Sequence, residues 1–309
     1  MSSTQEPANG GILKEKKPRT PNGQYPEPEI SSPQSEHRQT FVILHGRGST
    51  AKKLIPPLLE METTSKSNLQ KAFPHAKLVF LTASRTRATL YGRAYTHQWV
   101  NGWKMDDFDN RQDLMTPGLH TSCKYVHGIL QKEIAVIGEQ NVVLWGLSQG
   151  CATSLTSLLT WDGKPFAATV GMCGYLPFAT QIEEIATGKV ADAEDDGISF
   201  SDDEEGGSLF EGERVDKGSL STQAVQFLRD QVDLEDKAGM VFQEIPVFLG
   251  HGIDDAIVPV EMGRNARNCI ELVGGDVKMI EYEGLDHWYS PAMLDDIFAF
   301  LSQRLRIHE

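Results

Sequence analysis

The stretch NVVLWGLSQGCATSL, residues 141–155, places Ser148 in a Gly-x-Ser-x-Gly frame between two hydrophobic patterns. The five residues before the frame are mostly β-branched or aromatic and favour a strand, whereas the small and aliphatic residues of Cys151–Leu159 favour a buried helix. A strand, a sharp turn and a helix are the setting in which a serine is exposed on a strained elbow. Gly146 and Gly150 suit this setting, because a side chain would collide where the helix folds back over the strand. Taken alone, the pentapeptide fits an incidental serine in a glycine-rich turn equally well.

Short apolar runs alternate with helical patterns along most of the chain. The apolar runs predict strands at 40–44, 78–82, 141–145, 168–172, 246–250 and 277–281. The helical patterns lie at about 50–62, 121–138, 149–160, 260–273 and 291–305, with a further helix within 219–237. Strands that alternate with helices form a parallel sheet covered on both faces. The predicted fold class is therefore α/β, with a mostly parallel central sheet.

Two segments interrupt this pattern. Residues 1–38 contain six prolines among mostly polar residues, and we predict a disordered tail there. Residues 39–309 are predicted to form a single domain that carries an acidic, disordered insertion at about 183–218. The insertion has too little apolar surface to order itself, which favours a solvated spacer. The alternative is a lid that contacts substrate through its apolar residues, namely Ile198, Phe200, Leu209 and Phe210.

The net charge of −14 is concentrated in one region. Residues 181–240 contain seventeen acidic and five basic residues, a net charge of −12, which leaves about −2 for the remainder. The folded part therefore has no basic face of the kind that binds nucleic acid. We expect no nucleic-acid partner.

The cysteines and the hydropathy indicate a cellular compartment. No apolar run approaches the roughly 18 residues of a membrane span. Cysteines stand at four scattered positions without Cys-x-x-Cys spacing, which argues against zinc and against a disulfide framework: Cys123, Cys151, Cys173 and Cys269. We expect a soluble, cytoplasmic protein with at most transient membrane contact.

Candidate partners for Ser148 follow two later strands. A nucleophilic serine needs a base to take its proton and a carboxylate to orient that base. Asp254 and Asp255 lie in HGIDDAIVP (251–259), directly after a predicted strand, and His287 lies in YEGLDHWYSP (282–291), after the last one. Alone, Asp255 fits a helix N-cap and His287 fits a surface loop. The order serine, acid, histidine, with each residue at the carboxyl end of a strand, favours a catalytic set instead.

An oxyanion formed at Ser148 would need two backbone N–H donors. Gln149, at the N-terminus of the predicted helix, offers one. The second is assigned to the N–H of Arg47, in the loop HGRGS (45–49) that follows the first predicted strand. Chemistry of this kind requires no metal and no organic cofactor.

Four motifs together, FVILHGRGST, WGLSQG, HGIDDAIVP and YEGLDHWYSP, resemble those of one family. It is the acyl-protein thioesterase/carboxylesterase family, also described as phospholipase/carboxylesterase, and the chain is similar to its fungal-type members. The resemblance covers about 40–180 and 244–305. It implies an α/β-hydrolase fold.

The resemblance also implies a role for individual residues. The family nucleophile corresponds to Ser148, and the family base corresponds to His287, in a Gly-x-x-His sequence. Its acid corresponds to Asp255, the second of the two aspartates, because the family keeps an aspartate four positions before a proline, here Pro259. Members often have an apolar residue where this chain has Arg47.

The predicted function is hydrolysis of a carboxylic ester or thioester through an acyl-serine intermediate, with a small ester or an acylated protein as substrate. The aromatic segment 85–118 is the predicted acyl-binding wall, with Trp99 and Trp103 as its contacts, although ordinary core aromatics fit equally well. A lysophospholipase or small-ester hydrolase would use the same residues. A non-catalytic binding protein on this fold is the third alternative.

Overall fold

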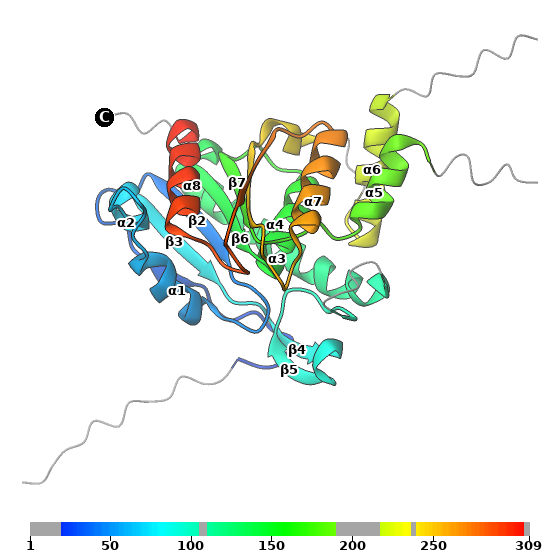
Figure 1. Cartoon of the computed structure of the whole chain (residues 1–309), viewed down its shortest axis with the longest axis horizontal. Coiled ribbons are helices and arrows are strands. Elements are labelled where there is room, and N and C mark those ends of the chain that lie inside the picture. Colours follow the sequence, from blue (N-terminus) through cyan, green and yellow to red (C-terminus); the bar gives the residue numbers. More distant parts are fainter. Residues whose placement is uncertain (1–19, 105–109, 190–216, 236–238, 306–309) are drawn as a thin grey trace, which may run out of the picture.

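The computed structural model describes residues 20–104, 110–189, 217–235 and 239–305. A seven-stranded sheet runs through the centre in the order β1-β3-β2-β6-β7-β8-β9 (Figure 1). β1 is antiparallel to β3, and the other neighbouring pairs are parallel. The strands are β1 (Glu29–Ser31), β2 (Gln39–Leu44), β3 (Ala76–Leu81), β6 (Val142–Leu147), β7 (Ala168–Met172), β8 (Val247–Gly252) and β9 (Val277–Tyr282). A separate antiparallel hairpin consists of β4 (Arg85–Ala88) and β5 (Ala94–His97).

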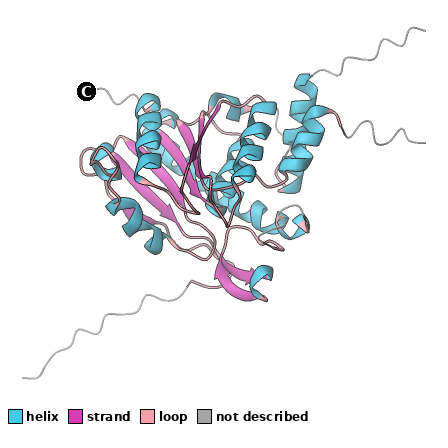
Figure 2. Cartoon of the chain, viewed as in Figure 1, coloured by secondary structure: helices cyan, strands magenta, loops and turns pink. Residues whose placement is uncertain are grey.

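Helices cover both faces of the sheet (Figure 2). On one face lie α1 (Ala51–Glu60), α2 (Leu69–Ala72) and α8 (Pro291–Arg304). The other face carries α3 (Thr116–Ile137), α4 (Gln149–Leu159), α5 (Ala179–Thr187), α6 (Lys217–Gln231) and α7 (Val260–Leu272). Short 3₁₀ helices occupy Thr89–Tyr91, Gln112–Leu114, Glu139–Asn141 and Val241–Glu244.

The strands alternate their side chains between these two layers. In β2, Phe41 and Ile43 pack with α1 and α8, whereas Val42 and Leu44 pack with α3 and α4. Because both faces are covered, all six residues of β2 are buried, and its last four residues are all apolar. The sheet is thus buried between two apolar cores, and the carboxyl ends of its parallel strands share one edge.

The predicted fold class is confirmed. Every predicted strand is present within two residues of its predicted bounds. The helix predicted at 121–138 begins earlier, at Thr116, because Pro117 is tolerated in the first turn. The β4–β5 hairpin was not predicted, since its two four-residue strands, RTRA and AYTH, have no alternating apolar pattern.

The N-terminal segment corrects one expectation. Residues 1–19 lie outside the described structure, but the prediction of disorder through residue 38 is wrong for residues 20–38. β1 pairs with β3, and Tyr25 stacks on Tyr125 with ring centroids 4.1 Å apart. The Tyr25 hydroxyl also hydrogen-bonds to the Ser122 hydroxyl at 2.9 Å. One aromatic anchor and one short edge strand thus order a segment whose overall composition is typical of disorder.

The predicted insertion is narrower than expected. The predicted start at residue 183 is wrong, because α5 continues to Thr187 and presents Ile182 and Ile185 to the core. Residues 190–216 lie outside the described structure. Within the described residues, no helix combines the length and the apolar character needed to cross a bilayer.

Candidate active site

Ser148 occupies the sharp turn between β6 and α4. Its backbone has φ 56° and ψ −119°, a conformation that a residue with a side chain rarely adopts. Close packing enforces the turn: a Cβ on Gly146 would lie 2.3 Å from the carbonyl oxygen of Gly150, and one on Gly150 would lie 2.5 Å from that of Leu44. The glycine frame therefore presses α4 against β6 and β2 and holds Ser148 at the strand ends.

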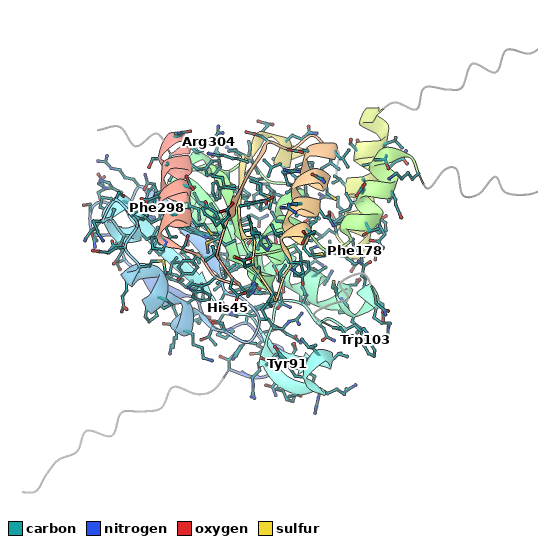
Figure 3. The ribbon with its side chains drawn as sticks, in the orientation of Figure 1. His45, Tyr91, Trp103, Phe178, Phe298 and Arg304 are labelled. Carbon is teal, nitrogen blue, oxygen red and sulfur yellow. The ribbon has the colours of Figure 1, made fainter. Side chains whose placement is uncertain are left out.

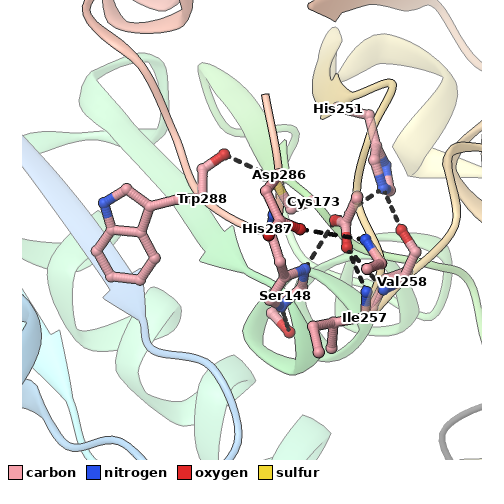
Figure 4. Close-up of polar contacts among 10 residues, drawn as sticks. Ser148, Cys173, His251, Ile257, Val258, Asp286, His287 and Trp288 are labelled. Atoms are coloured by element: carbon pink, nitrogen blue, oxygen red, sulfur yellow. Dashed lines mark hydrogen bonds and ion pairs between the residues drawn. The ribbon is translucent and has the colours of Figure 1, made fainter. Parts of the chain in front are cut away.

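Hydrogen bonds join three of the predicted residues in a line (Figure 4). The Nε2 atom of His287 lies 2.8 Å from the Oγ of Ser148, and its Nδ1 lies 2.7 Å from Oδ2 of Asp255. An ionised carboxylate can only accept, so Nδ1 of His287 carries the proton and Nε2 accepts from the serine hydroxyl. This is the tautomer that a general base requires.

Asp255 is buried at the far end of this line, directly after β8. Its Oδ1 accepts from the amides of Ile257 and Val258 at 2.9 and 2.8 Å. Burial opposes ionisation of Asp255, but its hydrogen bonds with His251 and His287 outweigh that effect and hold the pKa of the carboxyl well below its usual range. The neighbouring Asp254 is exposed. Of the two adjacent aspartates, Asp255 is the one that contacts His287.

Further contacts fix the loop that carries His287. The Oδ1 atom of Asp286 accepts from the His287 amide at 2.7 Å and from the Ala256 amide at 3.1 Å, which ties the histidine loop to the aspartate loop. The Cys173 thiol donates to the Trp288 carbonyl at 3.0 Å. Sequence reasoning missed both residues, because a carboxylate beside a catalytic candidate and a buried thiol carry no distinctive spacing.

The loop after β2 lies against the serine. A Cβ on Gly46 would lie 3.2 Å from the Cβ of Ser148, and Arg47 lines the same cavity as Ser148. Gln149 follows Ser148 as the first residue of α4. The structure thus brings both predicted oxyanion residues beside the serine.

A cavity of about 300 Å³ opens beside Ser148 and His287. Its apolar lining comes from Leu54, Tyr91, Leu147, Ile257 and Trp288. This volume is at the lower end of the range for small-molecule sites. Sequence reasoning named none of these five side chains, although the position of Trp288 directly after His287 was a usable signal.

The two predicted wall tryptophans do not line this cavity. Trp99 is 1% exposed, and its Nε1 donates to the His45 carbonyl at 2.7 Å, so it belongs to the core below the site. Trp103 lies at the periphery, toward the side that carries Phe178 (Figure 3), with the Arg111 guanidinium 5.8 Å from its ring. Their prediction as contacts of this cavity is corrected: among the described residues of the segment, Tyr91 lines it.

The sequence profile of the phospholipase/carboxylesterase family matches residues 25–192 and 227–305. The chain belongs to this family. It is a hydrolase that acts on ester bonds. The unmatched residues between the two parts include most of the acidic insertion.

Relatives and a solved structure are also similar to this chain. The chain is 26% identical to acyl-protein thioesterase 1 of Kluyveromyces lactis, over 76% of this chain and 81% of that protein. It is 24% identical to acyl-protein thioesterase 1 of Gibberella zeae, over 88% and 92% of the two chains. The crystal structure of Zea mays acyl-protein thioesterase 2 has the same fold, with a TM-score of 0.62, 19% identity and coverage of 91% of this chain and 100% of that one.

Proposed function

We propose that this chain hydrolyses carboxylic esters or thioesters through an acyl-serine intermediate, with Ser148 as nucleophile, His287 as base and Asp255 as acid. One observation carries the proposal: the unbroken hydrogen-bonded line from Ser148 Oγ through His287 to Asp255. A serine hydroxyl is a weak nucleophile unless a base accepts its proton. The line supplies that base in the required tautomer.

In the first half of the reaction, the Oγ of Ser148 attacks the acyl carbonyl carbon and its proton passes to Nε2 of His287. The ionised Asp255 stabilises the resulting imidazolium without itself becoming protonated. The backbone amides of Arg47 and Gln149 stabilise the oxyanion of the tetrahedral intermediate. When that intermediate collapses, the bond to the leaving alcohol or thiol breaks and His287 returns the proton to the leaving group.

In the second half, water attacks the acyl-serine ester and His287 takes its proton. The second tetrahedral intermediate collapses, the carboxylic acid departs and Ser148 regains its proton from His287. The half-open site supports entry of water, since the His287 side chain is 19% exposed.

The apolar lining of the cavity supports an acyl chain as the group bound there, and an exposed mouth allows the leaving group to be a small alcohol, a thiol or an acylated protein. A cytoplasmic location is part of the proposal. It is supported by the free state of Cys123, Cys151, Cys173 and Cys269, which suits a reducing compartment. Imaging of the tagged chain in its own cells tests that location.

Steady-state hydrolysis of nitrophenyl esters and acyl thioesters tests the activity. Ser148→Ala should remain folded and lose at least about 10³-fold in kcat, because binding and oxyanion stabilisation alone leave only residual catalysis. A folded Ser148→Ala protein with full activity would contradict the mechanism.

A further inference from the structure

Trp99 joins the two loops that supply the proposed oxyanion donors. Its indole Nε1–H donates to the carbonyl of His45 at 2.7 Å, two residues before Arg47. Its backbone N–H donates to Oε1 of the Gln149 side chain at 2.8 Å. A single buried residue therefore bonds to the loop after β2 on one side and to the start of α4 on the other.

Both ends of this link are themselves held. Gln149 also donates through Nε2 to the carbonyl of Val100 at 2.8 Å, so its side-chain amide hydrogen-bonds to the backbone of two consecutive residues, Trp99 and Val100. The Ser122 hydroxyl donates to the Trp99 carbonyl at 2.7 Å. A Cβ on Gly118 would lie only 2.9 Å from the Cα of Val100, which shows how closely α3 supports this segment.

The loop after β2 is anchored in the same way. Nε2 of His45 accepts from the Ala83 amide at 3.0 Å, so Nδ1 carries the proton and donates to the Gly46 carbonyl at 2.6 Å. The His45 ring also packs against the Trp99 indole, with centroids 5.3 Å apart. These bonds fix the carbonyls of His45 and Gly46. The Gly46 carbonyl and the Arg47 N–H belong to the same planar peptide unit, so fixing the carbonyl also orients the N–H.

We propose that Trp99 is a positioning residue that sets the separation of the Arg47 and Gln149 amides, and so determines how well the oxyanion is stabilised. The inference rests on the proposed function. Oxyanion donors act only when both lie about 2.7–3.1 Å from the developing charge, so a small shift of one loop weakens the transition state more than the bound substrate. The indole N–H of Trp99 prevents that shift.

Trp99→Phe tests this role, with Trp161→Phe as its matched control. Trp161 is equally buried, at 1% exposure, and its Nε1 likewise donates to a backbone carbonyl, that of Lys164, at 2.8 Å. Both variants lose one indole–carbonyl hydrogen bond and should lose similar thermal stability. We expect kcat and kcat/KM for a short nitrophenyl ester to fall about tenfold in Trp99→Phe, with KM nearly unchanged, and neither to change in Trp161→Phe.

A transition-state analogue separates positioning from general loosening. The Oγ of Ser148 adds to the carbonyl carbon of a trifluoromethyl ketone and forms a hemiketal oxyanion. The corresponding secondary alcohol has no carbonyl and forms no oxyanion. In Trp99→Phe, inhibition by the ketone should weaken by the same factor as kcat, and inhibition by the alcohol should stay constant. Equal weakening of both inhibitors, or an unchanged kcat in the folded variant, would overturn the proposal.

Gln149→Met provides a second route if Trp99→Phe does not fold. It keeps the backbone amide and the side-chain length but removes both hydrogen bonds to the Trp99–Val100 segment. Its kcat should also fall about tenfold, and where both singles fold, the double variant should be less impaired than the product of the two effects, because they break one link. If Ser148→Ala is inactive but Gln149→Met keeps the wild-type kcat, the role of Trp99 is overturned and the proposed function stands. If Ser148→Ala is active, the proposed function itself is overturned.

Discussion

The two sides of the cavity beside Ser148 are built in opposite ways. The polar framework, Ser148, His287 and Asp255, is joined by hydrogen bonds of 2.7–2.8 Å. The apolar mouth, Tyr91, Ile257 and Trp288, is 50%, 44% and 41% exposed. The framework, held in one geometry, carries out the reaction. The exposed mouth sets the affinity for each acyl chain through the apolar surface that the chain buries. Changes to the framework should therefore appear in kcat, and changes to the mouth should appear in KM.

The largest effect after removal of the nucleophile should come from the acid. Asp255→Asn keeps the shape of the side chain but no longer favours the tautomer in which Nδ1 of His287 carries the proton. We expect kcat to fall about 10³- to 10⁴-fold, as loss of the orienting carboxylate does in serine hydrolases generally. Ester hydrolysis at saturating substrate measures it.

Asp254→Asn is the matched control for that variant. Asp254 is exposed, and its backbone amide, which the substitution retains, donates to the Leu285 carbonyl at 3.1 Å. Its kcat should stay within about twofold of wild type, as for surface changes away from the site. If Asp254→Asn loses its activity while Asp255→Asn keeps it, the catalytic acid is Asp254 rather than Asp255.

The free energy of unfolding should depend on pH through His45, which lies beneath the polar framework. Burial lowers the pKa of His45 from 6.5 to about 4. Above pH 6.5 the ring is neutral in both the folded and the unfolded chain, and as pH falls from 6.5 to 4 the unfolded chain binds the proton first. As pH falls from 6.5 to 4, the free energy of unfolding should therefore decrease by about 3 kcal/mol because of His45.

Urea unfolding between pH 7.5 and 4 measures this effect, with His45→Asn as the comparison. The variant should be less stable at pH 7.5 but should lose about 3 kcal/mol less on acidification. Parallel pH profiles for the two proteins would show that His45 does not titrate as its burial requires.

The polar framework could be predicted from the sequence, and the mouth could not. Ser148, Asp255 and His287 each follow a strand that its apolar residues predict, and the carboxyl ends of parallel strands meet at one edge whatever the loop conformations. The mouth depends on loop conformation, which has no period: Trp99 and Trp103 stand in the same short segment, yet one is in the core and the other is peripheral.

The same limit applies to the N-terminal segment. Its prolines and polar residues outweigh Tyr25 in any average over composition, but in the structure the Tyr25 ring stacks on Tyr125 and β1 pairs with β3. One well-placed contact is invisible to a compositional argument.

Smaller effects are expected at the mouth. Ile257→Ala should raise KM for long acyl esters about threefold to tenfold and leave KM for acetyl esters and kcat unchanged, because each buried methylene contributes about 0.8 kcal/mol. Ile30→Ala removes another exposed isoleucine, on the edge strand β1, and should change neither constant. A fall in kcat for Ile257→Ala would mean that framework and mouth are not separable.

The smallest effect should follow replacement of residues 190–216 by a short glycine-serine linker. Gly188 and Leu220 are close in space, since a Cβ on Gly188 would lie 3.7 Å from a side-chain carbon of Leu220, so a short linker can join α5 to α6. Hydrolysis of short and long esters, and the melting temperature, should be nearly unchanged. Loss of activity on long esters alone would show that the insertion belongs to the substrate site.

Covalent labelling with a fluorophosphonate tests the central claim most directly, because the reagent reacts only with an activated serine. Intact-mass measurement should show one adduct per chain, and peptide mapping should place it on Ser148. His287→Ala should abolish labelling without unfolding the protein. An active enzyme that forms no adduct, or forms it on another residue, would contradict the account.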